Sequence, residues 1–327
     1  RKVRIEPNMI STNIEEAARL LMEGQVVAIP TETVYGLAGN AFSEPALRKI
    51  FSVKQRPHFN PLIVHIASAD MLPAIASDIP EKAKILADAF WPGPLTLVLP
   101  KNPIVPNLVT GGKPTVAVRV PNHPMSLALL RSIPFPLAAP SANLFGSLSP
   151  TRATHVEAGL GNLVTMVLDG GPCEKGIEST IVGFVYGEPV VYRLGSISLE
   201  ELSMVVGEVT LLTRDQHAPP APGMLDKHYA PKTKLILCDL ISEEIKNHDP
   251  LKTVALVLQK RDDLPEGMEQ VALSDKADLD EAASRLYDCL HELDKQGWGL
   301  ILAERMPDIG LGRSINDRLE RAAKQDE

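Results

Sequence analysis

Four short polar clusters interrupt the apolar segments in the first two thirds of the chain. They are Thr31–Tyr35, Lys54–Arg56 with Asn60 and His65, Ser141–Asn143 with Ser149, and Glu178–Thr180. Each lies at the end of a segment that we expect to form a strand, and loops at strand ends are where folds collect functional groups. Cationic, hydroxyl and amide side chains of these kinds hydrogen-bond anionic and polar ligands. The pattern therefore indicates a binding site for a polar ligand.

Two arginines lie inside apolar strands, Arg119 in Val-Ala-Val-Arg-Val and Arg193 in Val-Val-Tyr-Arg-Leu. A buried guanidinium is costly unless it is paired, so each either meets a buried carboxylate or faces an anionic ligand. If the chain had only one such arginine, pairing with a buried carboxylate would be the better explanation. However, the chain has no acidic residue between Asp88 and Glu157 although it keeps five bases there. Buried strands explain part of this gap, but the retained bases favour a common anion site.

Cysteine and histidine spacings argue against a disulfide framework or a metal cluster. The three cysteines are scattered, and the chain has no Cys-x-x-Cys, His-x-x-x-His or His-Glu-x-x-His. We therefore expect free thiols in a reducing compartment and no metal held by protein side chains. No apolar run approaches the ~20 residues that a membrane-spanning helix needs, and no segment resembles a signal peptide. The expectation is a cytoplasmic protein without a membrane partner.

The elements that must position the clusters alternate between short strands and helices. Apolar runs predict strands over 25–30, 61–65, 95–99, 115–120, 163–168, 179–186 and 189–193. Capping residues and periodicity predict helices over 12–23, 44–54, 80–90, 123–132 and 198–206. Because strands outnumber helices, we expect an α/β fold with a twisted mixed sheet and helices packed on it.

A second domain is predicted beyond a proline-rich segment. The chain has 327 residues, of which 44% are hydrophobic, and a net charge of −8, which suits about two globular domains. Residues 213–231 contain four prolines and few apolar side chains, so we place a linker there, between domains at 1–212 and 232–327. In the second domain, strands at 234–239, 253–259 and 299–304 alternate with helices at 241–247, 278–296 and 314–324. This alternation predicts a small parallel, Rossmann-like α/β domain, but it lacks a glycine-rich nucleotide-binding loop.

Taken in order, the clusters resemble the signature blocks of the YrdC-like family. The resemblance rests on Ile29–Leu37, Lys54-x-Arg56, Pro140–Asn143 and Glu178–Val182, within roughly residues 10–210. The remainder, including Gly310–Gly312 and Asn316–Leu319, is similar to the C-terminal domain of the long threonylcarbamoyl-AMP synthases. The resemblance implies a sheet around a large positive cleft. It also implies an enzyme that converts L-threonine, bicarbonate and ATP into L-threonylcarbamoyl-adenylate and pyrophosphate. A partner transferase complex would then use this product to modify an adenosine of tRNA. The chain itself would therefore act on tRNA only indirectly.

The resemblance also implies roles for individual residues, and positioning and charge neutralisation should dominate such a reaction. Lys54 and Arg56 would act as catalytic residues on the triphosphate. L-Threonine or its carbamate would be bound by Thr33, His65, Arg119 and Ser179. The nucleotide would contact Asn60, Thr115, Ser141, Asn143, Ser149, Arg193 and Tyr229. Tyr229 and its neighbour His228 belong to the linker, which we expect to close over the cleft as a lid. Mg²⁺ would arrive with ATP, bound mainly by phosphate and water oxygens.

Two other functions compete with this interpretation. A non-catalytic RNA-binding module could use the same positive cleft, but the second domain is acidic and aromatic residues are only 4% of the chain. The carbamoyltransferases of hydrogenase maturation also contain a YrdC-like domain. Those proteins add zinc-finger-like cysteine pairs, which this chain lacks.

Overall fold

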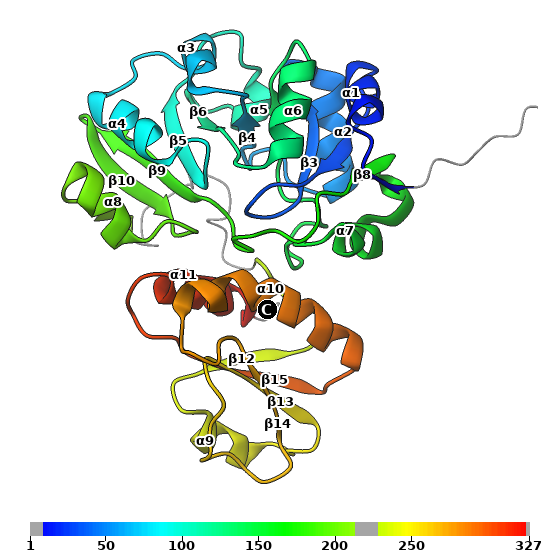
Figure 1. Ribbon diagram of the computed structural model, residues 1–327, viewed down its shortest axis with the longest axis vertical. Coiled ribbons are helices and arrows are strands. Elements are labelled where there is room, and N and C mark those ends of the chain that lie inside the picture. The colour runs from blue at the N-terminus through cyan, green and yellow to red at the C-terminus, as the bar shows by residue number, and fades with distance from the viewer. Residues whose placement is uncertain (1–8, 213–227, 325–327) are drawn as a thin grey trace, which may run out of the picture.

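The structure is a computed structural model that describes residues 9–212 and 228–324. It contains a larger first domain and a smaller second domain, and two helices of the second domain face the first (Figure 1). Most of the linker predicted at 213–231 lies outside the described residues. Within the described ranges, each helix is too short or too polar to cross a lipid bilayer.

The first domain is built on one mixed sheet of eleven strands, which confirms the predicted fold class. Its order is β1-β8-β2-β3-β7-β4-β6-β5-β9-β10-β11. The strands are β1 (Ile10–Ser11), β2 (Val27–Ile29), β3 (Gly36–Asn40), β4 (Ile63–His65), β5 (Leu95–Pro100), β6 (Thr115–Arg119), β7 (Leu137–Ala138), β8 (Met166–Leu168), β9 (Thr180–Val185), β10 (Glu188–Arg193) and β11 (Thr210–Leu211). Parallel pairing of β4 with β6 sets His65 beside Arg119. Sheet register therefore brings together two predicted site residues that are far apart in the sequence.

Helices cover both faces of this sheet. They are α1 (Ile14–Met22), α2 (Glu44–Lys54), α3 (Leu72–Ile75), α4 (Glu81–Phe90), α5 (Asn107–Thr110), α6 (Pro124–Ser132), α7 (Ala153–Leu160) and α8 (Leu199–Val206), with short 3₁₀ turns η1 (Ala69–Met71) and η2 (Gly161–Leu163). Alternate residues of β2 enter different cores, because successive strand side chains point to opposite faces. Val27 and Ile29 pack with α1 and α6, whereas Ala28 packs in the core that includes α2 and α4.

The second domain has a four-stranded, all-parallel sheet in the order β12-β15-β13-β14. The strands are β12 (Leu235–Cys238), β13 (Thr253–Val257), β14 (Glu269–Ala272) and β15 (Leu300–Glu304), and the helices are α9 (Ile241–Glu244), η3 (Ile245–Asn247), α10 (Leu279–Gln296) and α11 (Gly312–Ala322). Val254 and Leu256 pack towards α10 and α11, and Ala255 and Val257 pack towards α9. The predicted parallel α/β arrangement is confirmed.

Several elements were not predicted from the sequence, among them strands β3 and β14 and helix α7. Strand β14 lies at a sheet edge and reads Glu-Gln-Val-Ala, so it lacks the apolar run of a buried strand. Strand β3 reads Gly-Leu-Ala-Gly-Asn, and glycine is a poor strand former, yet β2 and β7 hold it on either side. Helix α7 starts at Ala153 without a side-chain hydrogen bond at its N-cap. In each case tertiary contacts decide the structure.

Gly195 provides a test of how tightly the β9 and β10 ends are packed. A Cβ on Gly195 would lie 2.4 Å from the carbonyl oxygen of Glu178 and from backbone atoms of Ser179 and Thr180. We expect Gly195→Ala to lower the free energy of unfolding by about 1–3 kcal/mol, the usual cost of overpacking, as measured by chemical denaturation. The control is Gly159→Ala in α7, where a Cβ meets nothing within 4 Å. Equal stability of the two variants would contradict the close approach.

Candidate functional site

The four polar clusters meet around one cavity of about 580 Å³, including space open to solvent. The residues that line it are Thr31, Thr33, Val34, Gly36, Arg56, Pro61, Ile63, His65, Arg119, Ala139, Pro140, Ser141, Glu178, Ser179, Arg193, His228 and Tyr229. Eight of the predicted site residues are among them, namely Thr33, Arg56, His65, Arg119, Ser141, Ser179, Arg193 and Tyr229. Three arginines against one carboxylate give this wall a positive character.

Arg119 meets a buried carboxylate, one of the two alternatives that its sequence context left open, and it also lines the cavity. It forms a buried ion pair with Glu32 at 2.6 Å. Its Nη1 donates to Thr33 Oγ1 at 2.9 Å, and its Nε donates to the Gly93 carbonyl at 3.3 Å. Glu32 is itself held by the backbone N–H of Asn122 at 3.0 Å, rather than by its own loop. The guanidinium is therefore fixed in one orientation before any ligand binds.

Arg56 and Arg193 are held mainly by carbonyl oxygens. Arg56 donates to the carbonyls of Asn60 at 3.3 Å and Pro61 at 2.8 Å. Arg193 donates to the carbonyl of Ser179 at 2.9 Å and to its hydroxyl at 3.1 Å. Burial lowers the pKa of Arg56 to about 9; Tyr229 opposes this effect and Arg193 adds to it. An anion bound in the cavity would offset the free-energy cost of burying these two guanidinium charges.

Lys54 lies behind the cavity wall instead of in it. Its ammonium donates to the carbonyls of Ser141 at 2.5 Å and Asn143 at 2.6 Å, and the side chain is only 1% exposed. Burial, with Arg56 nearby, lowers the pKa of Lys54 well below its usual range. The two cations of the Lys-x-Arg pattern diverge because Gln55 ends helix α2 in a left-handed conformation, with φ of 53°. In this structure Lys54 shapes the Ser141–Asn143 loop, while Arg56 reaches the cavity.

Four other predicted nucleotide contacts are not among the residues lining the cavity. Asn60 accepts from Arg56 through its carbonyl, and Asn143 donates to the carbonyls of Leu144 and Ser147 within its own loop. Ser149 donates to Glu178 at 2.5 Å. Thr115 begins β6, at the opposite end of the strand from Arg119. Their direct contacts with a nucleotide stay predictions, whereas Asn60 and Ser149 contact the cavity residues Arg56 and Glu178.

Glu178 is a cavity residue that belongs to one of the polar clusters but was assigned no role of its own. It lies directly before the predicted ligand-binding residue Ser179. His228 was assigned to the lid, and it lines the cavity together with Tyr229. The structure describes these two linker residues, whereas residues 213–227 lie outside the described part. In that described part, no group of three His, Cys, Asp or Glu side chains could hold a metal ion.

Comparisons with known proteins cover nearly the whole chain. A family model for Sua5, YciO and YrdC proteins, described as telomere recombination, matches residues 19–195. A second, described as the C-terminal domain of threonylcarbamoyl-AMP synthase, matches residues 197–324. Threonylcarbamoyl-AMP synthase of Bacillus subtilis is 41% identical, over 96% of this chain and 94% of that protein. The corresponding Pyrococcus abyssi protein is 38% identical, over 98% and 97%. The crystal structure of P. abyssi Sua5 complexed with L-threonine superposes with a TM-score of 0.88 at 40% identity, covering 95% of this chain and 94% of that one.

His65 provides a pH test of the cavity wall. Burial, reinforced by Arg119, lowers its pKa from 6.5 to about 3, so the folded protein keeps this ring neutral. Between these two values the unfolded chain binds a proton that the folded chain does not. The contribution of His65 to stability is therefore complete above pH 6.5 and is lost as the pH falls towards 3.

We expect the ring proton signal of His65, assigned by comparison with His65→Asn, to show no titration step between about pH 5 and 8 in an NMR experiment. The same experiment in denaturing urea should show a step near the ordinary value. A step near pH 6.5 in the folded protein would contradict the burial of this ring beside Arg119.

Proposed function

The chain belongs to the threonylcarbamoyl-AMP synthase family, and we propose that its cavity joins L-threonine, bicarbonate and ATP into L-threonylcarbamoyl-adenylate, releasing pyrophosphate. The observation that carries this proposal is the convergence of Arg56, Arg119 and Arg193 on one cavity. The reaction brings together a threonine carboxylate, a carbamate and a triphosphate. Three fixed guanidinium groups offset the repulsion among these anions.

Arg119 is the residue best prepared to bind the threonine carboxylate. A guanidinium has five N–H donors. Thr33 and Gly93 accept one each, from Nη1 and Nε, and Glu32 forms an ion pair with Nη2. Other N–H groups on the two terminal nitrogens can then hold the two oxygens of a carboxylate. Thr33, Ser179 and the neutral His65 line the same cavity and supply uncharged hydrogen bonds. They would orient the amino group for reaction with bicarbonate without adding charge.

Arg56 and Arg193 would hold the ATP phosphates near the carbamate. In the proposed step, a carbamate oxygen attacks the α-phosphorus and the bond from that phosphorus to the pyrophosphate oxygen breaks. Negative charge grows on the departing pyrophosphate, and an arginine fixed by backbone carbonyls is already in place to stabilise it. Mg²⁺ enters as part of the ATP complex, with phosphate and water oxygens as its ligands. Tyr229 and His228 would help to exclude water from the adenylate.

The adenylate would then pass, in the cytoplasm, to a transferase complex that modifies tRNA. This assignment rests on the chemistry of the product, a mixed anhydride that must be consumed by an acyl-transfer reaction. The acidic second domain would not attract a tRNA backbone, which favours tRNA binding by the partner. An RNA-binding module without catalysis is the weaker alternative, because curated synthases match this chain over nearly its full length.

The activity can be tested directly with the purified full-length chain. With ATP, Mg²⁺ and bicarbonate present, we expect pyrophosphate release only after L-threonine is added, because the carbamate is the nucleophile. The product should be identified as L-threonylcarbamoyl-adenylate by mass spectrometry. Reactions without threonine and without bicarbonate are the controls. Pyrophosphate release that does not depend on threonine would exclude this function.

Arg56→Ala should lower turnover by ~10²-fold or more, the scale for removing one charge-stabilising donor. The matched control is Arg48→Ala in helix α2, which ends just before Arg56, because Arg48 is exposed and forms an ion pair on the helix surface with Glu44 at 2.6 Å. Circular dichroism should show that both variants are folded, and Arg56→Lys should retain part of the activity. Near-normal turnover of Arg56→Ala would move the triphosphate to another part of the cavity.

A further inference from the structure

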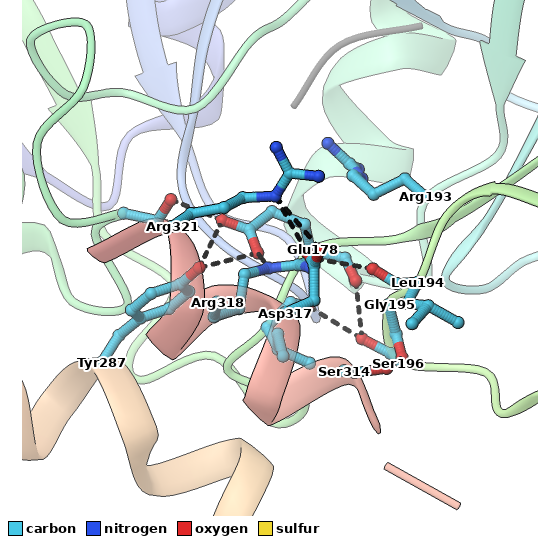
Figure 2. Close-up of polar contacts among 12 residues, drawn as sticks. Glu178, Arg193, Leu194, Gly195, Ser196, Tyr287, Ser314, Asp317, Arg318 and Arg321 are labelled. Carbon is cyan, nitrogen blue, oxygen red and sulfur yellow. Dashed lines mark hydrogen bonds and ion pairs between the residues drawn. The ribbon is translucent and has the colours of Figure 1, made fainter. Parts of the chain in front are cut away.

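Glu178 is a cavity residue whose carboxylate is held mainly by the other domain. It is 5% exposed and accepts from Ser149 of the first domain. Its other partners are Tyr287 and Arg318 of the second domain (Figure 2). The Tyr287 hydroxyl lies 2.9 and 3.0 Å from its two oxygens, and Arg318 Nε donates at 2.8 Å. Burial alone would raise the pKa of Glu178, but Arg318 and Arg193 outweigh this and lower it. The carboxylate is therefore ionised and firmly held.

Arg318 connects this carboxylate to two further parts of the cavity wall. Its Nη2 donates to the carbonyl of Leu194 at 2.8 Å, directly after the cavity residue Arg193. Its guanidinium carbon also lies 4.9 Å from the centre of the Tyr229 ring, in cation–π geometry. One fully buried arginine of the second domain thus contacts Glu178, the end of β10 and the linker tyrosine.

The sequence blocks at Gly310–Gly312 and Asn316–Leu319 explain how Arg318 is positioned. A Cβ on Gly312 would lie 2.0 Å from the Pro307 carbonyl, so the start of α11 requires glycine. The Asn316 side chain accepts from the Met306 N–H at 2.8 Å and donates to its carbonyl at 2.9 Å. Ser314, also on α11, donates to the carbonyl of Gly195 at 2.7 Å. These contacts fix α11 both to its own domain and to the end of β10.

Helix α10 adds a second line of contact on the same side. Tyr287 and His291 are four residues apart, so both face the first domain. The His291 ring Nε2 lies 2.9 Å from the carbonyl of Ser149, whose hydroxyl donates to Glu178. Val34 and Ile177 of the first domain share a hydrophobic core with α10 and α11. The two helices therefore support several adjoining wall segments at once.

We propose that Tyr287 and Arg318 are positioning residues for ATP, acting through Glu178, so that the second domain completes the nucleotide part of the synthase site. Naming ATP as the ligand rests on the proposed function. Simple docking of two domains would not require a buried ion pair at the cavity, because desolvating both charges is costly. Exposed pairs such as Arg313–Glu200 already bridge the same domains at 2.5 Å. The buried pair differs from them because it contacts cavity residues.

The test uses the full-length chain with Tyr287→Phe, Arg318→Lys and the control Arg313→Lys, which alters an interdomain ion pair on the same helix. Calorimetry measures the ATP Kd, and pyrophosphate release measures KM for ATP and L-threonine separately. Removing a hydrogen bond to a charged group should weaken ATP binding by ~10-fold in the first two variants. The KM for L-threonine should stay within about two-fold, because the Arg119 side of the cavity is untouched. Arg313→Lys should behave like the wild type.

Wild-type ATP affinity in Tyr287→Phe would overturn the inference. So would an equal loss in Arg313→Lys, or an equal loss for L-threonine, because either would mean that the contact only docks the domains. If Arg318→Lys does not fold, Tyr287→Phe decides the question, since it keeps the ring and removes only the hydroxyl. If the wild type binds ATP but releases no threonine-dependent pyrophosphate, only the proposed function is contradicted. The ATP Kd values of the variants then still decide whether Tyr287 and Arg318 position ATP.

Discussion

Burying positive charge beside a cavity is possible only if fixed oxygen atoms surround each cation. Lys54, Arg56, Arg119 and Arg193 are all less than 9% exposed, and each is held by oxygen atoms. For Lys54 and Arg119 these oxygens come from segments that are distant in the sequence. Lys54 needs the Ser141–Asn143 carbonyls, and Arg119 needs Glu32. The loops must therefore converge for the charges to be buried. In this way the requirement for an anion site also determines which strand ends meet.

The second domain also compensates a buried charge in the cavity wall, in this case the negative charge of Glu178. Glu178 is the carboxylate that lines the cavity, and it would oppose an anionic ligand if its charge were not neutralised. Arg318 neutralises that charge, and the Tyr287 hydroxyl lies within hydrogen-bond distance of both oxygens. The carboxylate is thus used as an anchor for the wall, while the three cavity arginines remain the dominant charges towards the ligand. The contacts that neutralise Glu178 are therefore also contacts that hold the second domain against the first.

Elements defined by local sequence could be predicted closely, and those defined by distant contacts could not. Helix α2 has the predicted bounds because Ser43 caps it and Gln55 ends it, which are local events. Strand β3 could not be predicted, since its glycines acquire strand geometry only between β2 and β7. In the site, eight predicted residues line the cavity: five come from the polar clusters, and the others are two strand arginines and the linker tyrosine. The placement of Lys54 depended on one backbone angle at Gln55, and the partners of Glu178 lie 109 and 140 residues further along the chain.

Two partners of Glu178, Tyr287 and Arg318, lie late in the sequence, and this has a consequence for biosynthesis. Domains fold as units, and the N-terminal one emerges first from the ribosome. When the first domain folds, Tyr287 and Arg318 have not yet been synthesised, so water must solvate the Glu178 carboxylate. Docking of α10 and α11 then replaces that hydration with protein donors and adds the shared apolar core around Val34 and Ile177. We therefore expect the cavity to be completed only when α10 and α11 dock, because a chain that ends before them lacks Tyr287 and Arg318.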